Sequence, residues 1–175
     1  MVEVVVSRLG LDSATQSYVV ILQEKDGERL LPIWIGQPEA ESIVMQMHDI
    51  KRVRPLTHDL CKSLIMGLGG NLRRVQITRV EKNTYYAELD IERGTDMVRV
   101  DERPSDSIAI ALRLSAPIFA SEELLSEVQI EETTEGAEPF GAEPEVVRGE
   151  GELSAEQLKE YLERLRPEDF GKFNL

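Results

Sequence analysis

Two stretches of this 175-residue sequence decide its fold, because they share one layout. Residues 19–47 read VVILQEKDGERLLPIWIGQPEAESIVMQM, and residues 85–114 read YYAELDIERGTDMVRVDERPSDSIAIALRL. Each contains a strand, a turn with glycine, a second strand, a proline, an acidic residue and a helix that carries Ser-Ile. Placing Ser42-Ile43 on Ser107-Ile108 brings Glu41 onto Asp106. The shared layout predicts a duplicated hairpin-helix unit.

The segments around these two units add further strands and one more helix. Residues 2–9 and 73–82 are rich in apolar β-branched residues and are expected to be strands. Residues 57–70, THDLCKSLIMGLGG, have the spacing of a helix that Gly69-Gly70 ends. Its predicted apolar face consists of Leu60, Leu64 and Leu68, joined by Cys61 and Ile65. The pattern predicts an α+β domain over residues 1–130, with a mixed or antiparallel sheet packed with about three helices.

Composition describes an ordinary globular chain with an acidic end. The chain is 41% hydrophobic and 30% charged, and it holds no run of about 18 apolar residues, so no membrane span is expected. Cys61 is the only cysteine, which argues against a disulfide framework and for a cytoplasmic location. The formal net charge is −13. Residues 1–121 hold 15 Lys and Arg against 17 Asp and Glu, whereas residues 122–175 hold 5 against 16.

The acidic end divides into two predicted parts. Residues 131–152 are rich in Glu, Gly and Pro and are expected to form a flexible acidic linker, because they contain too few apolar groups to offset the entropy of ordering. Residues 153–175 begin with a Ser-x-x-Gln capping box at Ser154 and repeat leucine at helical spacing, which predicts a short amphipathic helix and a tail. Such an acidic segment is expected to lower affinity for nucleic acid, since phosphates bind basic surfaces.

The stretch RPLTHDL, residues 54–60, carries one of only two histidines. Thr57 is predicted to cap a helix, and Asp59 suits its first turn, where the helix dipole favours a negative charge. His58 is not explained by helix initiation, because a cation is unfavourable there. A neutral imidazole suits a metal ligand, a general base or a hydrogen-bond donor. The alternative is a helix start that happens to carry a half-exposed histidine.

Two further helix starts carry similar polar groups. In DERPSDS, residues 101–107, either Ser105 or Asp101 is a candidate cap, and Arg103 suits a carboxylate or phosphate partner. Asp101 and Asp106 also suit a hard cation such as magnesium. If the sheet gathers the three helix starts, their polar side chains form a carboxylate-histidine cluster of the kind used in metal-assisted phosphodiester cleavage. That cluster comprises Glu39, His58, Asp59, Asp101 and Asp106.

Four stretches together resemble the bifunctional nuclease family of bacteria and plants: LPIWIGQPEAESI (31–43), RPLTHDL (54–60), NTYYAELDI (83–91) and RPSDSIAIALRLSAPIFASEELL (103–125). They occur in the family's order and at its spacing, over roughly residues 2–130. The resemblance implies a compact α+β domain and, as in characterised relatives, activity on RNA and DNA. The polar positions that the family shares fall on Glu39, Arg54, His58, Asp59, Arg103, Ser105 and Asp106.

The leading hypothesis is therefore a nuclease of low sequence specificity that acts on RNA and DNA and depends on a divalent metal, Mg²⁺ or Mn²⁺. His58, Asp59, Asp106 and Glu39 are the candidate catalytic residues, with Asp106 and Asp59 also as metal ligands. Arg54, Arg103 and Ser105 are the candidate substrate-binding residues. The alternative is a non-catalytic regulatory or binding module whose polar motifs cap helices and join subunits. A homo-oligomer is expected in either case, because short exposed strands often pair between subunits.

Overall fold

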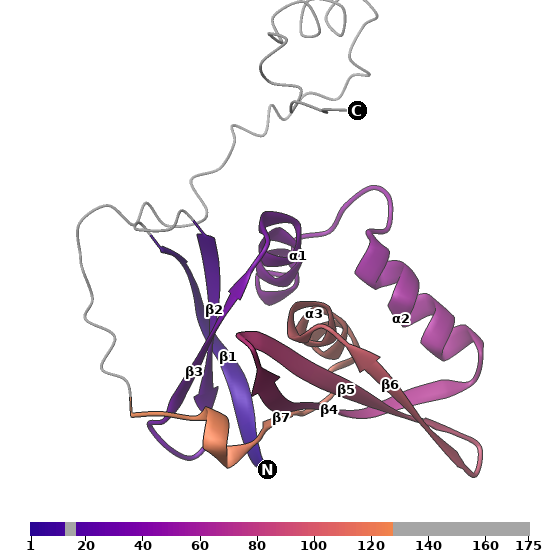
Figure 1. Ribbon diagram of the computed structural model, residues 1–175. Helices are drawn as coiled ribbons and strands as arrows, with labels where there is room; N and C mark the ends of the chain where they lie inside the picture. Colours follow the sequence, from indigo (N-terminus) through magenta and orange to yellow (C-terminus); the bar gives the residue numbers. More distant parts are fainter. Residues whose placement is uncertain (13–16, 128–175) are drawn as a thin grey trace, which may run out of the picture. The chain divides into compact units, whose positions relative to one another are not determined.

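The computed structural model describes residues 1–12 and 17–127 (Figure 1). The predicted acidic linker and C-terminal helix lie outside the described residues. The strands are β1 (Val2–Asp12), β2 (Ser17–Glu24), β3 (Leu30–Ile35), β4 (Gly70–Glu81), β5 (Thr84–Arg93), β6 (Asp96–Glu102) and β7 (Ile118–Ala120). The helices are α1 (Gln37–Met47), α2 (Thr57–Gly67), α3 (Pro104–Leu114) and a short 3-10 turn, η1 (Glu122–Leu124).

The strands form one seven-stranded sheet in the order β3-β2-β1-β7-β4-β5-β6. All neighbours are antiparallel except β4 and β7, which are parallel, so the sheet is mixed. Helices α1, α2 and α3 lie together on one side of this bent sheet (Figure 1). The prediction of an α+β fold with a mixed sheet and about three helices is confirmed.

The repeated layout of the sequence appears in the topology. An antiparallel meander β1-β2-β3 leads into α1, and a second meander β4-β5-β6 leads into α3. The short strand β7 joins the two meanders through β1 and β4. Counted from the helix starts, Glu39 and Asp106 occupy the same first-turn position. The sequence alignment paired Asp106 with Glu41, whereas the structure pairs it with Glu39, two residues earlier in the chain.

Tight turns set the registers of the meanders. In the first, the amide of Glu24 donates to the Arg29 carbonyl at 2.9 Å across the predicted glycine turn, which contains Asp26 and Gly27. In the second, Lys82 and Asn83 both have positive φ, 48° and 64°, as a two-residue hairpin connection requires. Since register decides which side chains face the helices, these turns determine the core.

The core lies between the sheet and the three helices. Strand residues Leu22, Leu31 and Ile77 are fully buried, and so are Ile43 of α1 and Ile108 of α3. Alternate residues of β2, β3, β5 and β7 supply this core, as the two-residue period of a strand requires, whereas β6 contributes no buried residue. No helix among the described residues is both long and apolar enough to cross a membrane.

The apolar face predicted for α2 is only partly correct. Cys61 and Ile65 pack against the core, but the leucines at positions 60, 64 and 68 are all more than half exposed. The face of α2 that points inward carries His58, Cys61 and Ile65. The leucines therefore face outward. The helix also ends at Gly67, and Gly69 takes the left-handed conformation at φ 75° that the predicted stop requires.

We expect Ile65→Ala to lower the free energy of unfolding by about 2 kcal/mol, because it removes side-chain volume from the core. Leu64→Ala, one residue away, should cost less than about 1 kcal/mol, because that side chain is 52% exposed. Urea denaturation of both variants measures the difference. Equal losses would contradict the observed orientation of α2.

Candidate active site

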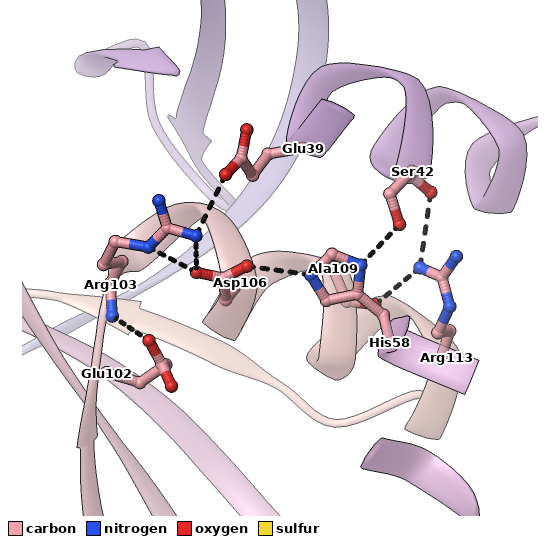
Figure 2. A network of polar contacts seen from close by, with 8 residues as sticks. All are labelled: Glu39, Ser42, His58, Glu102, Arg103, Asp106, Ala109 and Arg113. Carbon is pink, nitrogen blue, oxygen red and sulfur yellow. Dashed lines mark hydrogen bonds and ion pairs between the residues drawn. The ribbon is translucent and has the colours of Figure 1, made fainter. Parts of the chain in front are cut away.

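His58 is the second residue of α2 and is only 8% exposed (Figure 2). Its Nδ1 lies 2.8 Å from Ser42 Oγ of α1, and its Nε2 lies 2.9 Å from Asp106 Oδ1 of α3. A carboxylate only accepts hydrogen bonds, so the ring hydrogen belongs on Nε2. The free lone pair on Nδ1 then accepts the hydrogen bond of the Ser42 hydroxyl. The three side chains form a Ser-His-Asp series drawn from three helices.

Arg103 extends this series toward the surface. Its guanidinium lies 2.7 Å from Asp106 Oδ2 and 2.9 Å from Glu39 Oε1. Asp106 thus bonds His58 with one carboxylate oxygen and Arg103 with the other. The arrangement is suited to accepting a proton from the Ser42 hydroxyl and stabilising the resulting imidazolium.

A pocket of about 330 Å³ opens beside these side chains, and we call it the His58 pocket. This volume is at the lower end of the range for small-ligand sites. Its ionisable lining consists of Glu39, Glu41, Arg52, His58, Arg103 and Asp106, together with the hydroxyls of Ser42 and Thr57.

Asp59 faces a different pocket from its neighbour His58. Its carboxylate accepts hydrogen bonds from the Leu56 amide at 2.8 Å and from Arg113 Nε at 2.7 Å. The Arg113 side chain is 3% exposed and also donates to the carbonyls of Ser42 and Ala109. We call the cavity of about 440 Å³ beside this ion pair the Arg113 pocket. Burial is the largest influence on Asp59, but the Leu56 amide and Arg113 outweigh it and hold its pKa below the usual 3.8.

The structure brings together four of the seven predicted site residues: Glu39, His58, Arg103 and Asp106. The other three lie apart from this group. Asp59 lines the Arg113 pocket, Ser105 is buried in the first turn of α3, and Arg54 is exposed on the loop between α1 and α2. Neither Ser105 nor Arg54 lines the His58 pocket or the Arg113 pocket.

The predicted caps of two helices are wrong. Thr57 and Ser105 lie inside their helices, and Asp101 belongs to β6. The cap residues are Leu56 and Arg103, neither of which makes a side-chain cap hydrogen bond. Asp59 instead accepts the Leu56 amide, so one carboxylate both completes the first turn of α2 and pairs with Arg113.

Two residues of the network, Ser42 and Arg113, were absent from the predicted site. The only sequence signal for Ser42 was its place in the repeated Ser-Ile. Neighbouring residues in the sequence do not reveal the role of either side chain. The partner of Ser42, His58, lies 16 residues away, and the partner of Arg113, Asp59, lies 54 residues away. For Arg113, the available indication of a buried partner was its place as a charged residue on an otherwise apolar helix.

The donor set does not form a metal cage. No group of three or more His, Cys, Asp or Glu side chains is placed to hold an ion within residues 1–12 and 17–127. The predicted ligands Asp106 and Asp59 bond different arginines and line different pockets. However, Mg²⁺ is commonly held by one or two carboxylates together with substrate phosphates. Glu39, Glu41 and Asp106 line one pocket, so one or two of them suit that mode of binding once Arg103 releases Glu39 or Asp106, whereas Asp59 lines the other pocket.

Fold and site together define an α+β domain with a buried Ser-His-Asp series at the junction of three helices. Residues 20–133 match the family model of the bifunctional nuclease domain. The chain belongs to this family, which confirms the resemblance inferred from the sequence.

Relatives agree with this membership. An uncharacterized protein of Mycobacterium tuberculosis strain H37Rv is 38% identical over 170 residues, or 97% of this chain and 98% of that protein. Bifunctional nuclease 2 of Arabidopsis thaliana is 31% identical over 108 residues, or 60% of this chain and 33% of the plant protein. Bifunctional nuclease 1 of Oryza sativa subsp. indica is 29% identical over 110 residues, with coverage of 61% and 33%. The chain thus matches about one third of each plant protein.

We expect the acid sensitivity of the protein to depend on Asp59. Because its pKa is lowered in the folded state, its contribution to stability is complete above the usual value of 3.8 and is lost as the pH falls through the folded value. Asp59→Asn should therefore be less stable than the wild type near neutral pH, and the difference should shrink below pH 3.8. Denaturation at a series of pH values measures this difference.

Thr57→Ala serves as the control at the same helix start. It should change the free energy of unfolding by less than about 0.5 kcal/mol, because Thr57 makes no cap hydrogen bond. A loss of about 1 kcal/mol, as a true cap would give, would contradict the observed start of α2.

Proposed function

We propose that this chain is a cytoplasmic nuclease that cleaves phosphodiester bonds of RNA and DNA with low sequence specificity, and that the His58 pocket is its active site. The observation that carries the proposal is the Ser42-His58-Asp106 series, whose distances of 2.8 and 2.9 Å are those of hydrogen bonds. Membership of the bifunctional nuclease family supports the reaction class.

In the proposed reaction, His58 is the general base. A water molecule attacks the phosphorus and gives a proton to the Ser42 hydroxyl, which passes its own proton to His58 Nδ1, and Asp106 stabilises the imidazolium that forms. The bond from phosphorus to the leaving oxygen breaks, and the imidazolium returns the proton to that oxygen through Ser42. Arg52 and Arg103 line the same pocket and provide positive charge beside the phosphate. No step requires a ribose 2′-hydroxyl, which agrees with activity on both RNA and DNA.

Low sequence specificity follows from the kinds of side chain present. No aromatic residue lines the His58 pocket, so it offers no surface on which a base can stack. Arginine contacts to phosphate fix the position of a strand but do not distinguish one base from another.

Divalent-metal dependence forms part of this proposal. One or two of the carboxylates that line the His58 pocket, Glu39, Glu41 and Asp106, would hold an Mg²⁺ or Mn²⁺ ion shared with the substrate phosphate. When bound, such an ion would stabilise the negative charge that develops on the phosphate oxygens. Cleavage assays in Mg²⁺, in Mn²⁺ and in EDTA test this part separately from the role of His58.

A non-catalytic module is the second candidate, and the burial of His58 favours it. Both ring nitrogens bond to side chains of other helices, and Asp106 pairs with an arginine. The same geometry therefore suits a structural tie among α1, α2 and α3, in which His58 does no chemistry.

Substitutions within the series decide between these two functions. We expect Ser42→Ala, His58→Gln and Asp106→Asn each to lower cleavage of single-stranded RNA and DNA by about 10²- to 10⁴-fold. Each variant should remain folded, with a melting temperature lowered only by the loss of a buried hydrogen bond. The double variant His58→Gln/Asp106→Asn should be no worse than His58→Gln, because the three groups act as a unit. Gel assays of labelled oligonucleotides measure both effects.

His48→Gln is the matched control, because His48 is the only other histidine, is exposed and lines none of the described pockets. It should cleave like the wild type. Because it is purified in the same way as His58→Gln, any contaminating nuclease would be present in both preparations. If His58→Gln instead unfolds the protein, or folds and cleaves normally, His58 is a structural tie and the catalytic assignment fails.

We also propose a homo-oligomer in which β6 pairs with β6 of a second copy. This strand is one edge of the sheet, and all seven of its residues are exposed, including Met97, Val98 and Val100. Light scattering should show an assembly larger than one chain, and Val100→Lys should dissociate it. A strict monomer at high protein concentration would contradict this pairing.

A further inference from the structure

Within the part of the chain that the structure describes, most positive charges are paired. Arg74 and Arg99 both bond Asp90, which is 2% exposed, and Arg29 bonds Glu24 with two nitrogens. Within residues 1–12 and 17–127, six cationic side chains have neither a hydrogen bond nor an ion pair: Lys51, Arg52, Arg54, Lys62, Lys82 and Arg93.

The six unpaired cations are not spread evenly. Lys51, Arg52 and Arg54 lie on the loop between α1 and α2, and Lys62 lies on α2 itself. The Arg113 pocket is lined by Lys51, Arg52 and Lys62, and it shares the lining residues Met45, Arg52 and Leu56 with the His58 pocket. The two pockets are therefore neighbours, and Arg52 contributes to both.

The charges lining the two pockets have opposite balances. Three carboxylates, Glu39, Glu41 and Asp106, line the His58 pocket against the guanidinium groups of Arg52 and Arg103, which leaves one excess negative charge. The Arg113 pocket has two excess positive charges. Its cations are Lys51, Arg52, Lys62 and Arg113, and its anions are Asp49 and Asp59. A polyanion is therefore attracted to the Arg113 pocket more strongly than to the site of the proposed chemistry.

We propose that the Arg113 pocket is a phosphate subsite that binds a nucleic-acid strand beside the phosphodiester lying in the His58 pocket. Lys51 and Lys62 contact a neighbouring phosphate, and Arg52, which lines both pockets, lies between the two phosphates. No aromatic side chain lines the Arg113 pocket, so the subsite recognises the sugar-phosphate backbone of a single strand and not its bases. This inference rests on the proposed function, since it names where that substrate is held.

The test uses the full-length double variant Lys51→Ala/Lys62→Ala, because these lysines line the Arg113 pocket and not the His58 pocket. The matched control is Lys82→Ala/Arg93→Ala, which removes two unpaired cations from hairpin ends that line neither pocket. Fluorescence anisotropy measures the affinity for labelled oligothymidylate at several salt concentrations. A gel after each titration shows that the probe is intact.

We expect the plot of log affinity against log salt to become shallower by about 0.7 in the subsite variant, because that variant no longer neutralises one phosphate of the strand. The control variant should keep the wild-type slope. In cleavage assays the subsite variant should raise KM and leave kcat nearly unchanged, because it removes binding and not chemistry. Equal slopes in the two variants, or failure of the wild type to bind oligothymidylate at low salt, would overturn the subsite. Binding to phosphatidylserine vesicles in place of the oligonucleotide would also overturn it.

The two proposals fail in different ways. If the wild type binds the oligonucleotide through Lys51 and Lys62 but never cleaves it, the subsite stands and the nuclease function falls. If His58→Gln abolishes cleavage while Lys51→Ala/Lys62→Ala binds and cleaves like the wild type, the nuclease function stands and the subsite falls.

Discussion

The imidazole of His58 is buried where three helices meet, and each of its nitrogens has to find a partner from another helix. A buried polar group without a hydrogen bond costs about 1–3 kcal/mol, so Ser42 and Asp106 stabilise the fold whatever else they do. This requirement fixes α2 relative to α1 and α3. It also orients a base beside an open pocket, so the demands of stability and of chemistry fall on the same three side chains.

The two repeated meander-helix units explain why Glu39, Arg103 and Asp106 lie together. Each meander leads directly into a helix, and the sheet places the two meanders on either side of β7. The first turns of α1 and α3 then carry Glu39 and Asp106 at equivalent positions, and Arg103 binds both carboxylates. Helix α2, which lies between the repeats in the sequence, adds the histidine that neither repeat contains.

Charge pairing separates two kinds of arginine in this protein. Arg74, Arg99 and Arg113 are bound to carboxylates and hold strands or helices together. Arg52 and Arg54 are exposed on one loop and have no such partner within the described residues. The net charge of the chain is −13, but the loop that carries Arg52 and Arg54 has a local excess of positive charge. For a phosphate ligand, the local distribution matters more than the total, because charges beyond about 10 Å are screened by salt.

The sequence by itself determined the elements and their class. Period-two strands, glycine turns and prolines at helix starts are local signals, and they located both repeats, the three helices and the family stretches around His58, Arg103 and Asp106. The tertiary structure alone decided which polar groups share a site. Asp59 is adjacent to His58 in sequence, yet the 100° turn per helical residue directs it to Arg113 in the other pocket. Ser42 has an unremarkable sequence context, yet the packing of α1 on α2 places its hydroxyl on the imidazole, because contact between residues so far apart depends on the whole fold.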